Sequence, residues 1–200
     1  MKLLKLLTQI AIISMPMAGS AERLLVDIDL IWKPTQELHD QSFHHFKDDS
    51  SLKVEIQDGR TVKPATRIGL NQEESNTFLP VETENDVANF VRTSLISTLK
   101  NFEFRITDHK PELTLVGEIK EFFVTETNEY RGKININYKL KRGNKVIWQK
   151  EIAGENISSG RSYKLNNYME NLSNCLLDSA EKLATDVEFK RAFQTKKEKS

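Results

Sequence analysis

A strictly alternating stretch at residues 133–141 constrains the fold more than any other part of the sequence. Its apolar residues occupy every second position: Ile134, Ile136, Tyr138 and Leu140. Because neighbouring side chains of a strand point to opposite faces, this period of two predicts a strand with one buried and one wet face. Gly143 and Asn144 then favour a tight turn, and Val146, Trp148 and Ile152 resume the apolar pattern, so we predict an antiparallel hairpin.

Shorter stretches with the same period predict further strands. They lie at residues 24–32, 52–56, 104–107 and 111–124. Within the last of these the apolar phase shifts, which predicts a bulge near Lys120 or Glu121. Residues 33–51 show no sustained period and are expected to form a long loop. We also expect a loop at residues 62–81, around a short extended piece at residues 67–70.

Two segments carry apolar residues three and four positions apart, the spacing of one helix face. The first contains Val87, Phe90, Val91, Leu95, Leu99 and Phe102. The second contains Leu165, Tyr168, Met169, Leu172, Leu176, Ala180, Leu183, Ala184 and Val187. We expect Thr83 to cap the first helix. Because these helices and strands are each apolar on one side only, the sequence predicts an α+β fold in which two amphipathic helices pack on one face of a mainly antiparallel sheet.

The start of the chain matches a cleavable export signal. A positively charged beginning and a short apolar stretch are followed by the small residues Gly19, Ser20 and Ala21. We therefore expect a signal peptide at residues 1–21, a single domain at 22–193 and a disordered basic tail at 194–200, with the processed chain in the periplasm. Serine stands where a lipoprotein has its acylated cysteine, so we expect any association with the outer membrane to be peripheral.

Charge and cysteine content exclude several classes of function. The chain has 29 basic and 29 acidic residues, so it lacks the basic field that holds a nucleic acid. After residues 1–21 we expect no membrane-spanning segment. The single cysteine, Cys175, rules out an internal disulfide framework. Its place beside the apolar stripe of the second helix predicts a buried thiol rather than a nucleophile.

The residues with the greatest potential for chemistry lie at positions 39–49. They are His39, Asp40, His44, His45, Asp48 and Asp49. Imidazoles and carboxylates bind zinc or copper when three or four converge, but this spacing matches no metal motif, so we expect a polar loop. Gly160 and Arg161 precede a helix that could bind an anion, yet the pattern of a phosphate loop is missing. The sequence thus predicts no catalytic residue, metal or cofactor.

Several local features occur in a characteristic order over residues 50–193. They are Asp58-Gly59-Arg60 followed by Ile68-Gly69, the strand at 113–119, Tyr130, Trp148, Gly154, Gly160-Arg161-Ser162, Asn167-Tyr168 and Leu172-Ser173. In this order they resemble the YajG-like family of bacterial envelope lipoproteins. The resemblance implies a small α+β domain exported to the envelope, with no enzymatic reaction and no catalytic residues. Ser20 departs from the lipidation pattern of that family, and residues 39–49 have no counterpart in it.

Three classes of function remain open. We favour a non-catalytic envelope component that binds a partner protein, or serves in assembly, through the exposed sheet face or residues 60–70. The candidate partner-binding residues are Asp58, Arg60, Arg67 and Arg161. The alternative is an accessory protein of an envelope transport system that binds lipid or another apolar ligand between helix and sheet. A metal-dependent enzyme that uses the His39–His45 loop is the least favoured class.

Overall fold

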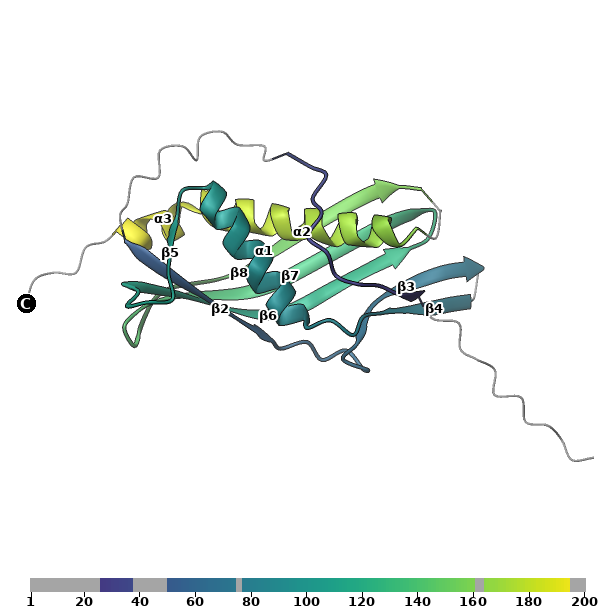
Figure 1. The fold of residues 1–200 in the computed structure, drawn as a ribbon, viewed down its shortest axis with the longest axis horizontal. Helices are drawn as coiled ribbons and strands as arrows, with labels where there is room; N and C mark the ends of the chain where they lie inside the picture. The colour runs from purple at the N-terminus through teal and green to yellow at the C-terminus, as the bar shows by residue number, and fades with distance from the viewer. Residues whose placement is uncertain (1–25, 38–49, 75–76, 161–163, 195–200) are drawn as a thin grey trace, which may run out of the picture.

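In residues 26–37, 50–74, 77–160 and 164–194, which the computed structural model describes, three helices cover one face of a curled eight-stranded sheet (Figure 1). The strands are β1 (Val26–Asp27), β2 (Ser51–Asp58), β3 (Arg67–Glu74), β4 (Thr77–Glu82), β5 (Arg105–Ile106), β6 (Leu113–Glu126), β7 (Glu129–Arg142) and β8 (Lys145–Ser159). The helices are α1 (Val87–Asn101), α2 (Leu165–Thr185) and α3 (Val187–Gln194). The predicted α+β class is confirmed.

The sheet is mixed, and the prediction of a mainly antiparallel sheet is wrong. Its central strand, β6, runs parallel to β2 and β3 along one edge and antiparallel to β7 along the other. Four of the seven strand pairings within the described residues are parallel. A parallel neighbour requires a long connection, and β3, β4, α1 and β5 separate β2 from β6 along the chain. Local alternation identifies a strand but does not report the direction of a distant neighbour.

The predicted antiparallel hairpin is confirmed as β7 and β8. Ile136 lies opposite Ile152, and Gly143 in the turn has a φ of 57°, which glycine adopts without steric cost. The predicted bulge is confirmed as well, because the pairing of β6 with β7 shifts between Ile119 and Glu121. These two features depend on residues close together in the sequence.

Residues 62–81, which we expected to form mainly a loop, contain β3 and most of β4. The two strands pair antiparallel, with Asn71 opposite Leu79 and Leu70 opposite Pro80. β4 lies next to the two-residue strand β1, near the margin of the sheet, where a proline without an N–H group is tolerated. The polar residues and Pro80 of this segment led to the prediction of a loop, whereas the segment forms a hairpin.

α1 begins later than expected, and its N-cap is Asp86 rather than Thr83. The Asp86 carboxylate accepts a hydrogen bond from the Asn89 backbone N–H at 3.0 Å. The Thr83 hydroxyl instead accepts from the Asn85 backbone N–H at 3.2 Å, in a local turn before the helix. The predicted apolar stripe of α1 is buried, as are the corresponding residues of α2 except Leu165.

The second helical stripe is divided into two helices where one was predicted. Extended backbone at Asp186 ends α2, and the Asp186 carboxylate accepts from the Phe189 backbone N–H at 2.7 Å, which starts α3. Val187, expected on the buried stripe, is 60% exposed, whereas Phe189 and Phe193 enter the core. The capping aspartate therefore turns the chain and changes which face is buried.

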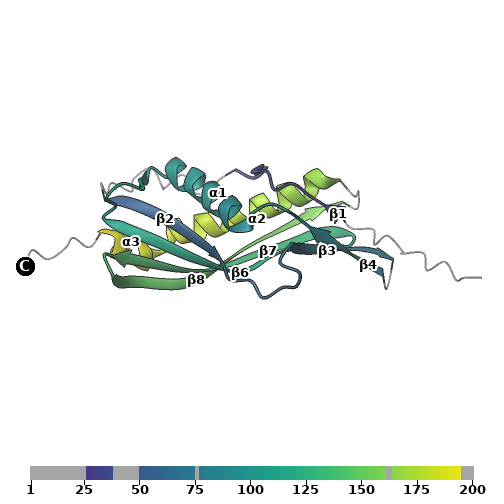
Figure 2. The ribbon, with the colours of Figure 1, turned by 60° about the horizontal axis from the view of Figure 1, so that its bottom comes forward.

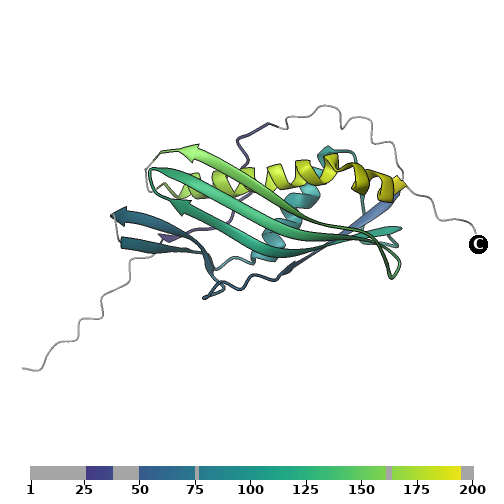
Figure 3. The same cartoon turned by 180° about the vertical axis from the view of Figure 1, so that it is seen from behind.

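The helices share one side of the sheet, which we call the inner face (Figure 2). α1 lies on β2, and α2 lies on β7 and β8. α2 approaches the strands closely at two glycines: a β-carbon at Gly132 would lie 2.6 Å from Cys175 Sγ, and one at Gly154 would overlap the Cys175 carbonyl oxygen. The opposite, outer face carries no helix (Figure 3).

α2 also covers part of the free edge of β8. The Asp178 carboxylate accepts a hydrogen bond from the Glu155 backbone N–H at 2.9 Å, and Lys182 Nζ donates to the Ala153 carbonyl at 3.1 Å. Asp178 and Lys182 form an ion pair with each other at 2.7 Å. Backbone groups on the open side of this edge strand are thus satisfied by helix side chains.

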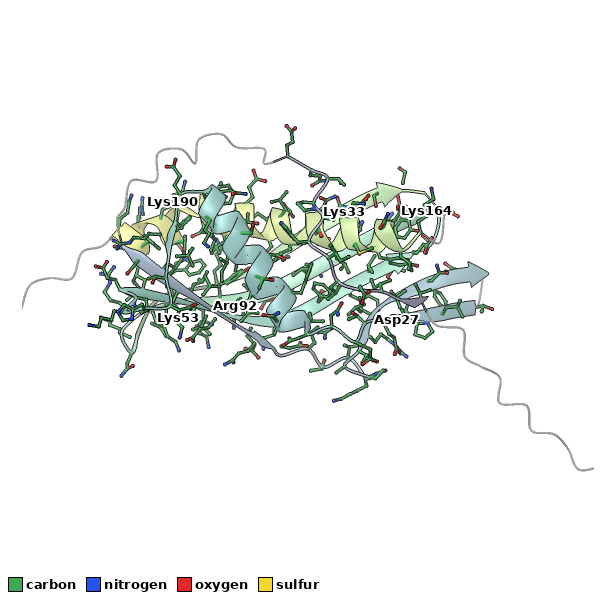
Figure 4. All side chains as sticks on the ribbon, viewed as in Figure 1. Asp27, Lys33, Lys53, Arg92, Lys164 and Lys190 are labelled. Atoms are coloured by element: carbon green, nitrogen blue, oxygen red, sulfur yellow. The ribbon has the colours of Figure 1, made fainter. Side chains whose placement is uncertain are left out.

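Residues 28–37 cross the helical layer and are attached to α2, beside which Lys33 lies in Figure 4. The Lys33 backbone N–H donates to Ser173 Oγ at 3.0 Å, and the Thr35 backbone N–H donates to Asn174 Oδ1 at 2.9 Å. Residues 33–37 are irregular, as predicted for the start of the long loop. Residues 38–49 of that loop, which include all of its histidines, lie outside the described residues, and Ser51, predicted to end the loop, already belongs to β2.

Candidate binding crevice

β6 changes its parallel neighbour partway along its length. β2 pairs with it up to Ile119, and β3 pairs with it from Val124 onward. No strand of the described chain pairs with residues 120–123 on this side of β6; the loop at residues 59–66 connects β2 to β3 there. A crevice of about 370 Å³ opens beside the loop, lined by Arg60, Thr61, Val62, Lys120, Glu121, Phe122, Phe123 and Asn135.

Arg60 organises the loop from inside. Its Nε and Nη2 donate to the two Asp58 carboxylate oxygens at 2.8 and 2.7 Å. The same guanidinium donates to the carbonyls of Ala65 at 3.0 Å and Arg67 at 3.2 Å, and lies 5.9 Å from the centre of the Phe122 ring. Hydrogen bonds from Arg60 hold the pKa of the Asp58 carboxyl below its ordinary value. Five contacts from one planar group fix the conformation of the loop.

The structure therefore brings together three of the four residues predicted to bind a partner: the side chains of Asp58 and Arg60, and the carbonyl of Arg67. The Arg60 side chain is only 4% exposed, and contact with its guanidinium would have to displace the bonds just described. Arg67 contributes its carbonyl to Arg60, while its own guanidinium lies 3.5 Å from the Glu82 carboxylate. Arg161 lies outside the described residues. Direct recognition by these residues stays a prediction; their observed contacts shape the loop.

The accessible wall of the crevice combines apolar and charged groups. Thr61 is exposed, and Val62 and Phe123 are half-buried. Lys120 is 39% exposed and pairs with Glu118 at 2.6 Å. The bulge at Lys120 widens β6 where it lacks a strand partner. Such a surface can bind an apolar side chain between charged groups, and nothing in this wall forms a nucleophile with a hydrogen-bonded base.

A second polar cluster, which the sequence analysis missed, is buried between β6, β7 and α2. Glu126, 1% exposed, accepts hydrogen bonds from the hydroxyls of Tyr130, at 2.7 Å, and Tyr168, and from the Asn71 amide. Burial and donation to Glu126 raise the pKa of Tyr168. The signal was present, because Glu126 continues the apolar phase of Phe122 and Val124. A carboxylate so enclosed joins the end of the sheet to α2 rather than meeting a ligand.

The structure bears on the two alternative functions, binding of an apolar ligand between helix and sheet and metal-dependent catalysis, in different ways. Close contact of α2 with Gly132 and Gly154 leaves no room for an apolar ligand between this helix and β7 or β8. Residues 38–49, on which a metal site would depend, lie outside the described part of the chain. Elsewhere in the described ranges, no three or more histidine, cysteine or acidic residues are grouped to hold a metal ion. None of the helices in those ranges combines the length and apolar character needed to cross a bilayer.

Cys175 is buried, as its place in the sequence predicts. Burial raises the pKa of its thiol to about 12, so the thiolate is not formed near neutral pH. Its sulfur lies 3.9 Å from Asn171 Oδ1, in the contact between α2 and β7. The residue acts as a small packing group.

Comparison with known proteins identifies the fold but not a family. No family model and no curated protein matches this chain. Among solved structures, a Xanthomonas campestris protein of the family model DUF330 is 11% identical, with 68% of this chain and 81% of that chain covered and a TM-score of 0.51. An uncharacterized protein is 12% identical over 68% and 90% of the two chains, with a TM-score of 0.50. A minor lipoprotein from Acinetobacter baumannii is 10% identical over 71% and 94%, with a TM-score of 0.40.

The first two likenesses define the class as an α+β domain of the architecture found in the DUF330 protein. At such identities they establish the fold alone. Membership of the YajG-like family specifically stays a prediction, and the neighbours indicate no catalytic family.

Proposed function

We propose that this chain is an exported, non-catalytic envelope protein that binds an extended segment of a partner protein in the crevice beside β6. Residues 1–21 would be removed on export, residues 22–193 would form the binding domain in the periplasm, and residues 194–200 would form a basic tail. The export pattern of the first residues supports the location. The crevice supports the activity.

The observation that carries the proposal is the fixed loop at residues 59–66. Arg60 holds it through Asp58 and two backbone carbonyls, so the wall of the crevice is formed before a partner arrives. A preformed wall lowers the conformational entropy lost on binding. Binding therefore does not require the loop to fold at that moment.

The chemistry of the wall favours a protein segment. Residues 120–123 of β6 lack a strand partner on this side within the described chain, and an extended segment can lie along such a stretch. Val62 and Phe123 offer apolar contact, and Lys120 and Glu121 offer one charge of each sign. A partner segment with an apolar side chain flanked by charges fits this surface.

Site-specific photocrosslinking in intact cells tests the proposal. A crosslinker at Thr61 or Val62 should trap the same partner, whereas one at the exposed Ser97 of α1 should not. Phe123→Asp should abolish the crosslink from Thr61 while the purified variant keeps its far-ultraviolet circular dichroism. Identical products from all three positions, or none from the crevice, would contradict the proposal.

A further inference from the structure

Three lysines near the β7–β8 turn have no ion pair with an acidic side chain of the described residues; Lys139 and Lys141 lie on the outer face. Lys139 and Lys141 lie on β7, and Lys145 begins β8. Other lysines on sheet strands are paired: Lys53 with Glu55, Lys120 with Glu118, and Lys133 with Glu121. The unpaired lysines are thus confined to one end.

Strand register places an apolar side chain among these charges. Val146 lies directly opposite Lys141, and Lys139 lies two positions along the same face of β7. Side chains two positions apart on a strand are separated by about 7 Å. Val146 is 44% exposed. Lys145 precedes it at the turn, opposite Arg142, so its side chain leaves the strand on the other side. We call this group, Lys139, Lys141, Lys145 and Val146, the turn patch.

The charge changes sign farther along the outer face. In the next row toward the middle of the sheet, Asn137 lies between Glu118 on β6 and Glu151 on β8. Glu118 is paired with Lys120, so Glu151 carries the remaining negative charge of this row, and a negatively charged surface is attracted more strongly to the turn end than to the middle. The lysines of the turn patch repel one another and form no ion pair with the acidic residues that the structure describes, an arrangement that an anionic partner would stabilise.

We propose that the turn patch docks the protein onto the anionic lipid headgroups of a membrane. The lysines contact the phosphates while Val146 enters the headgroup layer. An exposed valine among the cations favours a membrane over a soluble polyanion, because only the membrane offers an apolar layer beneath its charges. The turn patch lies apart from the crevice beside residues 59–66, so this inference does not depend on the proposed function.

Sedimentation of the purified chain with lipid vesicles tests the proposal. We expect binding to phosphatidylcholine vesicles that contain phosphatidylglycerol, no binding to pure phosphatidylcholine, and weakening by salt. Each lysine removed should weaken binding about fivefold, so Lys139→Gln/Lys141→Gln should lose about 25-fold. The control Lys133→Gln/Lys164→Gln removes the same charge from the same molecule and should bind as the unmodified chain does.

Val146→Ser separates a membrane from a soluble polyanion. It should weaken vesicle binding and leave binding to heparin unchanged. Equal losses in the two lysine double variants would overturn the proposal, because net charge alone would then explain binding. So would undiminished vesicle binding by Val146→Ser together with heparin binding that depends on Lys139 and Lys141, since the partner would then be a soluble polyanion.

Discussion

The carbonyl oxygen of Cys175 in α2 occupies the space that a β-carbon on Gly154 of β8 would need. The Ser179 backbone nitrogen would lie 2.7 Å from the same β-carbon. Both obstacles are helix backbone, which cannot move aside as a flexible side chain can. Glycine at this position therefore sets how closely α2 approaches the sheet.

Gly154→Ala should lower the free energy of unfolding by about 3 kcal/mol, because the methyl group forces helix and strand apart. Urea unfolding followed by circular dichroism measures the change. Gly143→Asn is the control: this turn position has no neighbour within 4 Å, and asparagine tolerates its positive φ. Equal losses from both substitutions would show that the contact with α2 is not the cause.

The Asp58–Arg60 pair should make stability depend on pH in the acid range. Arg60 lowers the pKa of Asp58 in the folded chain, so the pair stabilises the fold above the unfolded pKa of about 4, and this contribution is lost as the pH falls through the folded value. A double-mutant cycle with Asp58→Asn and Arg60→Gln measures the coupling. The coupling free energy should be favourable at neutral pH and vanish in strong acid. A coupling that stays constant over this pH range would contradict a stabilising ion pair between Asp58 and Arg60.

Glu126→Gln should destabilise the fold by about 2 kcal/mol, because the carboxylate accepts hydrogen bonds from Tyr130 and Tyr168, and an amide nitrogen would oppose one of these donors. Chemical denaturation provides the measurement. Glu129→Gln is the matched control in the same hairpin, since it removes only an ion pair with the exposed Arg131, worth less than about 1 kcal/mol. A smaller effect at Glu126 than at Glu129 would disprove the role of the buried cluster.

Cys175 should react with a thiol reagent only when the chain unfolds. The side chain is fully buried, so a reagent cannot reach the sulfur. Burial also raises the pKa of the thiol to about 12, so the reactive thiolate is not formed near neutral pH. Reaction rates measured across a urea series should follow the unfolding transition. Ser97→Cys adds an exposed thiol that should react at once in native buffer. Rapid labelling of Cys175 in native protein would show that α2 opens independently.

Sequence periodicity predicted those parts of the fold that depend on neighbouring residues. The alternation at Ile134 and Ile136 identified β7, and the phase shift near Lys120 identified the bulge. Both patterns report which side of a strand is buried, and burial is visible locally. The parallel direction of β2 relative to β6 depends on the long connection between them, which contains β3, β4, α1 and β5. No local pattern in the sequence indicates this direction.

Competing local contacts explain the remaining differences. Thr83 and Asp86 are both good caps, and the hydroxyl of Thr83 is used in a turn with Asn85, which leaves Asp86 to begin α1. Arg60 was predicted to bind a partner, but its guanidinium is directed at Asp58 and the loop carbonyls. The crevice could not be predicted from the sequence. It lies between β2 and β3, which both pair with β6, and β6 is distant from them along the chain.

The hydrogen bonds of Asp178 and Lys182 to the free edge of β8 affect how one molecule can associate with another. A bare strand at the margin of a sheet invites the same strand of another molecule to add on, and repetition of that addition produces fibrils. Here the N–H of Glu155 and the carbonyl of Ala153 are already engaged by side chains of the same chain. The middle of this margin is therefore closed to cross-β stacking, even where the protein accumulates at high concentration.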